Sequence, residues 1–242
     1  YSICARPREE KRQELIVVSS ADNTARPFAQ VCSDNNINQL LTIPEDNLNA
    51  LWFEKPLNPC VKVLATKSGS DYFDAINLGN IACEVEGFFA EGGAKNIARR
   101  DGMGTTMLSA TTFIGRIPDY YFQAVGSGTG AIAAWEANLR FIEDGRYGKH
   151  KARIFVSQNR PFVPMYDAWK QDSRELLPYD TEQARIDANT IIAKVLSNRK
   201  PPYSLAGGLY DTLKDTNGDF FAVTNEEAKK AGIIFEDLEG ID

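Results

Sequence analysis

The sequence predicts an α/β fold in which mostly parallel sheets carry helices on both faces. Short aliphatic runs of strand length alternate with segments of helical periodicity, which is the pattern of repeated strand–helix units. One segment repeats apolar side chains at spacings of three, four and three residues, which places them on one buried stripe of a helix. They are Ile132, Trp135, Leu139 and Ile142. A loop with three glycines leads directly into that helix, as strand-to-helix loops do in parallel sheets.

The first half of the chain is expected to hold three strands and two helices. The first strand is the aliphatic run at residues 15–18, and two serines follow it directly. Residues 25–32 follow with apolar side chains at helical spacing. A second strand at 40–43 stops at a proline, which has no amide hydrogen for a ladder. A third strand at 61–64 precedes a long helical segment at 72–85.

The second half of the chain repeats the alternation. An aromatic strand at 120–125 runs into the glycine loop, the helix at 129–143 follows, and the next strand lies at 153–156. Ligands of parallel α/β sheets bind at the carboxyl ends of the strands, where the strand-to-helix loops gather. These loops are therefore where the sequence predicts a site.

Composition and charge exclude several classes of function. The net charge is −6, and no block of Lys or Arg forms the footprint of a nucleic-acid-binding protein. No apolar run approaches the roughly 18 residues that a membrane span requires, and the first residues lack the features of a signal peptide. We therefore expect a cytoplasmic protein without nucleic-acid or membrane partners. The sequence leaves open whether it forms a homo-oligomer.

Histidine and cysteine chemistry is not indicated. His150 is the single histidine, so a Ser-His-Asp triad, a Cys-His dyad and a multi-histidine metal site would all have to include it. The four cysteines are spread along the chain without a C-x-x-C pair, which favours neither a zinc site nor a disulfide framework. They are Cys4, Cys32, Cys60 and Cys83. We expect no metal site.

The glycine loop is the strongest candidate for a ligand site. It reads Gly126-Ser127-Gly128-Thr129-Gly130. Glycine lets a backbone turn tightly and approach a ligand closely, and amides at a helix start bind phosphate well. The spacing is neither the G-x-G-x-x-G dinucleotide fingerprint nor a P-loop. The alternative is a tight turn that only packing requires.

Two further loops combine polar and charged residues. Ser20-Ala21-Asp22-Asn23-Thr24 follows the first strand and precedes a helix; its side chains suit a carboxylate or a ring hydroxyl, and equally suit helix capping. Residues 91–104 combine glycines with cations, including Arg99 and Arg100, which suits an anionic substrate. The alternative for this segment is a solvated basic helix face.

Together these stretches resemble the fold-type II pyridoxal-phosphate enzymes, in the branch of threonine synthase and cysteate synthase. That branch has an S-x-G-N loop after an early strand, matched by residues 20–23, and a G-G-A-x-N-x-A-R-R-D-G-M-G segment, matched by 92–104. The stretches 121–136, 158–165 and 198–208 fit as well. Residues 23–26, 44–47 with 51–53, and the N-R-K-P-P-Y-S segment are most similar to cysteate synthase.

The resemblance implies a fold like that of the tryptophan synthase β-subunit and a pyridoxal 5'-phosphate cofactor. It implies three parts: residues 1–27 in a large cofactor domain, 28–110 in a small substrate-side domain, and 111–242 in an incomplete large domain. It also implies a β-replacement in which O-phospho-L-serine, a small anionic amino acid, and sulfite give L-cysteate and phosphate.

Carried over by position, the resemblance also implies roles for individual residues. Asn23 would hydrogen-bond the ring oxygen of the cofactor, Ser20 and Thr24 would hold the substrate carboxylate, and residues 126–130 would hold the cofactor phosphate. We add the hypothesis that Arg99 or Arg100 binds the substrate phosphate or sulfite.

Two departures from the family pattern bear on these expectations. Asp22 stands where the family has glycine, which puts a negative charge beside the expected carboxylate site. The family's Schiff-base lysine lies some two dozen residues before the asparagine loop, so we expect it upstream of Tyr1 and leave the catalytic residue unassigned. The family's C-terminal segment, whose hydroxyl meets the pyridine nitrogen, is expected beyond Asp242, so the chain is expected to be truncated at both ends. Lys11 reads as a solvated surface residue. The chain alone is then expected to be inactive.

Three alternatives stay open at this point. The rival within the class is a threonine synthase acting on O-phosphohomoserine. From other classes, the chain could be a non-catalytic interaction domain or a ligand-binding domain that retains only the anion site.

Overall fold

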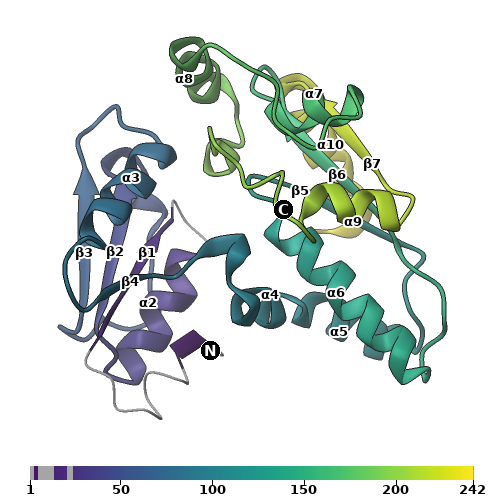
Figure 1. Cartoon of the computed structure of the whole chain (residues 1–242), viewed down its shortest axis with the longest axis horizontal. Helices are drawn as coiled ribbons and strands as arrows, with labels where there is room; N and C mark the ends of the chain where they lie inside the picture. The colour runs from purple at the N-terminus through teal and green to yellow at the C-terminus, as the bar shows by residue number, and fades with distance from the viewer. Residues whose placement is uncertain (1–2, 5–13, 21–23, 242) are drawn as a thin grey trace. The chain divides into compact units, whose positions relative to one another are not determined.

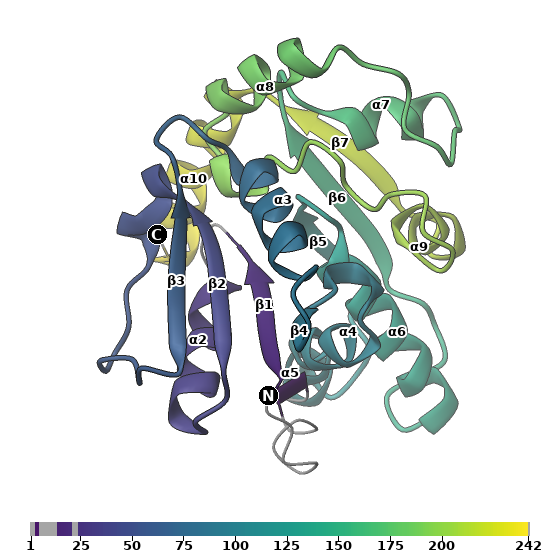
Figure 2. The same cartoon turned by 60° about the vertical axis from the view of Figure 1, so that its left-hand side comes forward.

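Two units make up the structure, which is a computed structural model that describes residues 3–4, 14–20 and 24–241. Unit 1 is Tyr1–Gly102 and unit 2 is Met103–Asp242. Each unit has its own sheet, and every strand pairing among the described residues is parallel. The expected α/β class with mostly parallel sheets is thereby confirmed (Figures 1 and 2).

Unit 1 is built on a four-stranded sheet of order β3-β2-β1-β4. Its elements are β1 (Leu15–Ser19), α2 (Ala25–Asp34), β2 (Gln39–Pro44), η1 (Glu45–Ala50), β3 (Val61–Thr66), α3 (Tyr72–Ala82), β4 (Phe88–Ala90), η2 (Gly93–Lys95) and α4 (Ile97–Met103). The last residue of α4, Met103, is the first residue of unit 2. The register places Val18 opposite Leu41 and Ser19 opposite Thr42.

Helices cover both faces of the unit 1 sheet. Ile16, Val18 and Leu41 form a buried cluster with residues of α2. The alternate residues of β1 face α3, because a Cβ added at Gly79 of that helix would lie 2.2 Å from Ser19 Oγ. Neighbouring side chains along a strand point to opposite faces, so α2 and α3 pack on opposite sides.

Unit 2 is built on a three-stranded sheet of order β5-β6-β7. Its elements are α5 (Thr105–Ile114), β5 (Tyr120–Ala124), α6 (Thr129–Asp144), β6 (Arg153–Asn159), α7 (Pro164–Lys170), α8 (Thr181–Thr190), η3 (Lys194–Leu196), α9 (Leu209–Asp215), β7 (Asp219–Val223) and α10 (Asn225–Glu239). The sheet packs against α6, α7 and α9.

The two faces of the unit 2 sheet differ in burial. Ile154, Val156 and Phe220 are fully or almost fully buried, and each such side chain contributes about 1.5–3 kcal/mol to folding. The opposite face carries an aromatic row in which Phe122 stacks on Phe155 with ring centroids 5.2 Å apart. Phe122 and Phe221 of that row are exposed.

The expected functional division into residues 1–27 with 111–242, and 28–110, stays a prediction. In the structure, β1 and β2 belong to one sheet.

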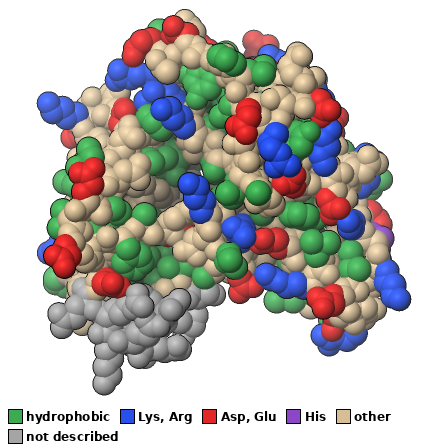
Figure 3. All heavy atoms as spheres, in the orientation of Figure 1, with side chains coloured by type: hydrophobic (Ala, Val, Ile, Leu, Met, Phe, Trp, Pro, Cys, Tyr) green, Lys and Arg blue, Asp and Glu red, His purple; other side chains and the backbone are tan. Residues whose placement is uncertain are grey.

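No helix in the described part of the chain combines the length and apolarity needed to cross a bilayer. Basic and acidic side chains are interspersed on the face shown in Figure 3.

Candidate functional site

The glycine loop lies at the carboxyl end of β5, where the sequence predicts a site. The amide of Val125 still donates to Ser157 O at 2.9 Å, so the loop begins only after this bond. Gly128 then has a left-handed backbone with φ of 78° and caps the N-terminus of α6. A residue with a Cβ adopts this conformation at a cost of about 1–2 kcal/mol, which explains glycine at position 128.

Close packing accounts for all three glycines of the loop. A Cβ at Gly126 would lie 3.1 Å from Leu196 Cα, and one at Gly128 would lie 2.8 Å from Leu209 Cδ2. A Cβ at Gly130 would lie 2.4 Å from Gln123 Nε2. The packing alternative thus explains why glycine is needed here. It does not explain why most of the loop's backbone amides lack a hydrogen-bond acceptor.

Five of the six backbone amides from Gly126 to Ala131 have no acceptor among the described residues. They belong to Gly126, Ser127, Gly128, Gly130 and Ala131. The amide of Thr129 contacts Ser127 Oγ at 3.4 Å, and the first helical bond of α6 is donated by Ile132. Helices leave their first amides unsatisfied, and these amides with the helix dipole bind anions.

Side chains at the loop add to its fit for a phosphate group. Ser127 Oγ and Thr129 Oγ1 lie 2.8 Å apart, and either can donate to the other. Thr129 is buried. The first turn of the 16-residue helix α6 holds no acidic residue, so no carboxylate competes for the amides. The residues present therefore fit a phosphate monoester.

The second predicted loop is only partly described. Asn23 and Asp22 lie outside the described residues, and so does Lys11. Ser20 is buried at the end of β1, and its Oγ accepts a hydrogen bond from the amide of Ala25 at 3.2 Å. Ser20 thus satisfies the amide of the first residue of α2, whereas the N-cap residue, Thr24, makes no side-chain capping bond. Its role toward a substrate carboxylate stays a prediction.

Thr24 and Arg99 come together although 75 residues separate them. Arg99 NH2 donates to Thr24 Oγ1 at 3.1 Å. Arg99 NH1 also forms an ion pair with Glu91 Oε2 at 2.6 Å, and both side chains of this pair are largely buried. Arg100 NH1 donates to the carbonyl of Ala94 at 2.6 Å. Thr24 and Arg99, two of the predicted substrate-binding residues, therefore form one cluster with Glu91 in unit 1.

Glu91 is a member of this cluster to which sequence reasoning assigned no role. It directly follows β4, and its Oε2 also accepts a hydrogen bond from the amide of Gly93 at 3.2 Å. Its Oε1 is buried without a partner among the described residues. The signal in the sequence is a single carboxylate placed before two glycines and eight residues before Arg99. That spacing alone does not distinguish it from a surface glutamate.

The remaining reactive side chains do not form a site. His150 is partly exposed, with Nε2 3.6 Å from Asp119 Oδ1. Cys4 and Cys32 are buried with their sulfurs 3.7 Å apart, and the pKa of the Cys32 thiol is raised by its hydrogen bond to Cys4 and by burial. The described residues contain no group of three or more His, Cys, Asp and Glu side chains that could hold a metal ion.

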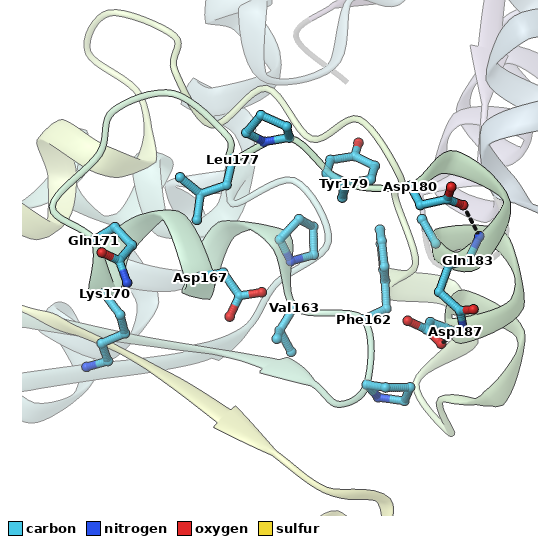
Figure 4. A pocket seen from close by; sticks show the side chains of 14 residues that line it. Phe162, Val163, Asp167, Lys170, Gln171, Leu177, Tyr179, Asp180, Gln183 and Asp187 are labelled. Atoms are coloured by element: carbon cyan, nitrogen blue, oxygen red, sulfur yellow. Dashed lines mark hydrogen bonds between the residues drawn. The ribbon is translucent and has the colours of Figure 1, made fainter.

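A cavity of about 400 Å³ lies elsewhere in unit 2, next to α7 and α8. Figure 4 shows Asp167 pointing into it between Val163 and Leu177, with Phe162 and Tyr179 on its far side. Burial raises the pKa of the Asp167 carboxyl, and Arg160 opposes this shift. None of the residues that the sequence predicts for the site lines this cavity.

The chain matches a protein family described as pyridoxal-phosphate dependent enzymes over residues 1–242. It is 47% identical to cysteate synthase from Methanosarcina mazei over 97% of this chain and 56% of that protein. It is also 47% identical to cysteate synthase from Methanospirillum hungatei, over 96% of this chain and 54% of that protein. The chain thus spans about half the length of the curated relatives it matches.

Solved structures agree in fold. A hydrogen sulfide-producing enzyme from Fusobacterium nucleatum is similar with a TM-score of 0.61 and 11% identity, over 99% of this chain and 72% of that one. Maize serine racemase is similar with a TM-score of 0.61 and 12% identity, over 96% of this chain and 63% of that one. The family match covers the whole chain, including the phosphate-fitting loop and the cluster in unit 1. The chain therefore belongs to the pyridoxal-phosphate-dependent enzymes.

Proposed function

We propose that the full-length protein replaces the phosphate of O-phospho-L-serine by sulfite, giving L-cysteate and phosphate. The observation that carries the proposal is the similarity to cysteate synthases across nearly the whole chain. The residues at positions 23–26, 44–47, 51–53 and 198–204, which resemble cysteate synthase, support the same choice over threonine synthase.

The glycine loop is proposed to hold the cofactor. Pyridoxal phosphate, when bound, supplies an electron sink for bond breaking at the substrate's α-carbon. The free amides of Gly126, Ser127, Gly128, Gly130 and Ala131 would bind its phosphate, with Ser127 and Thr129 as hydroxyl donors. The burial of Thr129 and the α6 dipole strengthen these contacts, since charge interactions are stronger away from water. Asn23 is proposed to contact the cofactor ring.

The cluster in unit 1 is proposed to bind the substrate. Ser20 and Thr24 would hold the carboxylate, and Arg99 or Arg100 would bind the phosphate or sulfite. The contact between Arg99 and Thr24 supports a shared role. Both lie at the carboxyl edge of the unit 1 sheet, because β1 and β4 are parallel neighbours. The Schiff-base lysine is proposed to lie in the part of the full-length protein that this chain does not include.

Product analysis of the full-length protein tests the reaction. The protein, loaded with pyridoxal phosphate, is given O-phospho-L-serine plus sulfite, or O-phosphohomoserine alone, and the products are identified by mass spectrometry. The proposal expects cysteate and phosphate from the first mixture only. Threonine from the second mixture, without cysteate from the first, would establish the threonine synthase alternative.

Cofactor absorbance separates a truncated enzyme from a binding domain. We expect the full-length protein to show the visible absorbance of a lysine-bound cofactor and residues 1–242 alone to lack it. Absence of this absorbance in the full-length protein as well would favour a non-catalytic role.

A further inference from the structure

Arg26 is a cation of unit 1 with no acidic partner among the described residues. It lies in the first turn of α2, and its guanidinium stacks on the ring of Trp52, with Cζ 3.3 Å from the ring centroid. Its Nε is buried and has no hydrogen-bond acceptor in the described part of the chain. A buried donor ordinarily has an acceptor, so the guanidinium of Arg26 is not fully satisfied by the described residues.

The charge balance of unit 1 favours Arg26 over Arg99 as the source of attraction for an anion. The charge of Arg99 is offset by Glu91 at 2.6 Å, so this buried pair is neutral as a whole. Arg26 forms no ion pair with any of the described residues. It also lies at the N-terminus of a ten-residue helix whose first turn holds no acidic residue, where the helix dipole adds positive potential.

The position of Arg26 places it beside the predicted substrate residues. It follows Thr24 by two residues, so the two Cα atoms are at most about 7 Å apart, and Thr24 accepts a hydrogen bond from Arg99. Trp52 follows η1, which begins directly after the carboxyl end of β2. Since β1 and β2 are parallel neighbours, both elements that carry this stack emerge at the same edge of the sheet.

We propose that Arg26, oriented by Trp52, is a specificity-determining residue that binds an oxyanion of sulfur or phosphorus. Stacking on an indole ring holds the guanidinium in one plane and leaves its edge free for two parallel hydrogen bonds to two oxygens. Sulfite and a phosphate monoester both offer such oxygens. The assignment of this anion to the reaction rests on the proposed function.

Fluorescence titration of the full-length, cofactor-loaded protein tests the site directly. Trp52 is exposed beneath Arg26, so an anion bound to Arg26 should change its emission. Sulfite, inorganic phosphate and acetate are titrated separately, and the signal of Trp52 is isolated by subtracting the Trp52→Phe variant. A saturable signal with sulfite supports binding of the nucleophile, and one with phosphate supports binding of the substrate phosphate. An equal response to acetate at the same ionic strength would overturn the proposal.

Variants of Arg26 supply the second arm. Arg26→Met keeps much of the apolar stem and should weaken sulfite or phosphate binding about tenfold or more, as expected for a charge-assisted hydrogen bond. Arg26→Lys should bind with intermediate affinity, because it keeps the charge and loses the planar fork. Arg153→Met is the matched control, since Arg153 also stacks on an aromatic ring, that of Phe155.

Kinetics distinguish this proposal from the proposed function. The proposal expects the apparent KM for sulfite or for phosphoserine to rise in Arg26→Met and Arg26→Lys, with kcat changed less. Cysteate formation with unchanged KM and unchanged titrations in both variants would overturn the role of Arg26 and leave the reaction intact. Anion titration that depends on Arg26, in a protein that forms no cysteate, would support the site and reject the reaction. If Arg26→Met does not fold, an Arg26→Lys protein with wild-type affinity overturns the proposal.

Discussion

Replacement of Gly128 by alanine tests how the phosphate-binding turn is held. The backbone of Gly128 is left-handed, with φ of 78°, which costs a residue with a Cβ about 1–2 kcal/mol. The added Cβ would also lie 2.8 Å from Leu209 Cδ2 and 3.1 Å from Leu209 Cβ and Cγ. Leu209 is fully buried, so it cannot move aside, and overpacking of this kind costs about 1–3 kcal/mol. We therefore expect Gly128→Ala to lower the free energy of unfolding by about 2–5 kcal/mol in total.

Gly207→Ala is the matched control. Gly207 has φ of 67° and no atom within 4 Å of an added Cβ, so its replacement carries only the backbone cost of about 1–2 kcal/mol. Urea unfolding of both variants is followed by the fluorescence of Trp135 and Trp169, which lie in unit 2. Equal destabilisation by the two substitutions would refute the packing of Leu209 against the turn.

Three further predictions concern an ion pair, a carboxyl group and a hydroxyl. Glu91→Ala should lower the free energy of unfolding by about 3–5 kcal/mol, because Arg99 is left buried without its counter-charge; a change below about 1 kcal/mol in urea unfolding would mean that the pair behaves as an exposed one. The hydrogen bond from Lys151 lowers the pKa of the Asp215 carboxyl. The stabilisation from this Lys151–Asp215 interaction is therefore present at neutral pH. It is lost as the pH falls from about 3.9, the ordinary pKa of an aspartate, through the lowered pKa of Asp215. Asp215→Asn should therefore be less stable than the wild type at pH 7, and the difference should shrink to zero in acid; a constant difference in unfolding free energy across pH would contradict this. Thr129→Val should weaken binding of pyridoxal phosphate about tenfold in equilibrium titration and leave binding of pyridoxal unchanged; equal losses for both compounds would place the hydroxyl away from the phosphate.

The regular elements of the fold were predictable where the apolar pattern is long or strongly periodic. The expected strands at 15–18, 40–43 and 153–156 are found as β1, β2 and β6. The expected helix at 129–143 is found as α6 (Thr129–Asp144). Of its expected buried stripe, Ile132 is buried, whereas Trp135, Leu139 and Ile142 are half-buried. The expected helical segment at 72–85 ends earlier, since α3 stops at Ala82.

Several elements carry too weak a local signal to be predicted. β4 is three residues long, and only its pairing with β1 makes it a strand. Residues 236–242 show no terminating helix in the sequence pattern, yet α10 extends to Glu239, and its start is fixed by a capping box at Thr224 and Glu227. The apolar residues of α10, such as Phe235 and Leu238, are exposed. The helix therefore has no buried apolar stripe from which the sequence could predict it.

The candidate site was predictable to a similar degree. The glycine loop is visible in the sequence because strand, glycines and helix are contiguous. The structure adds that five of its amides have no acceptor among the described residues. The contact of Arg99 with Thr24 was not predictable, because it depends on the pairing of β1 with β4. Glu91 meets Arg99 locally, eight residues along the same segment. The stack of Arg26 on Trp52 likewise depends on which strands are neighbours. Sequence patterns identify residues with suitable chemistry, and the sheet order decides which of them meet.

The amides of residues 126–131 can be observed directly in the full-length protein. Labelling with 15N-glycine and assignment through single Gly-to-Ala variants would give resolved signals for Gly126, Gly128 and Gly130. We predict that these signals shift on addition of pyridoxal phosphate and do not shift on addition of pyridoxal, because only the former carries the anion that they bind. Saturable binding of pyridoxal phosphate with all three glycine signals unmoved would contradict the assignment of this loop as the phosphate site.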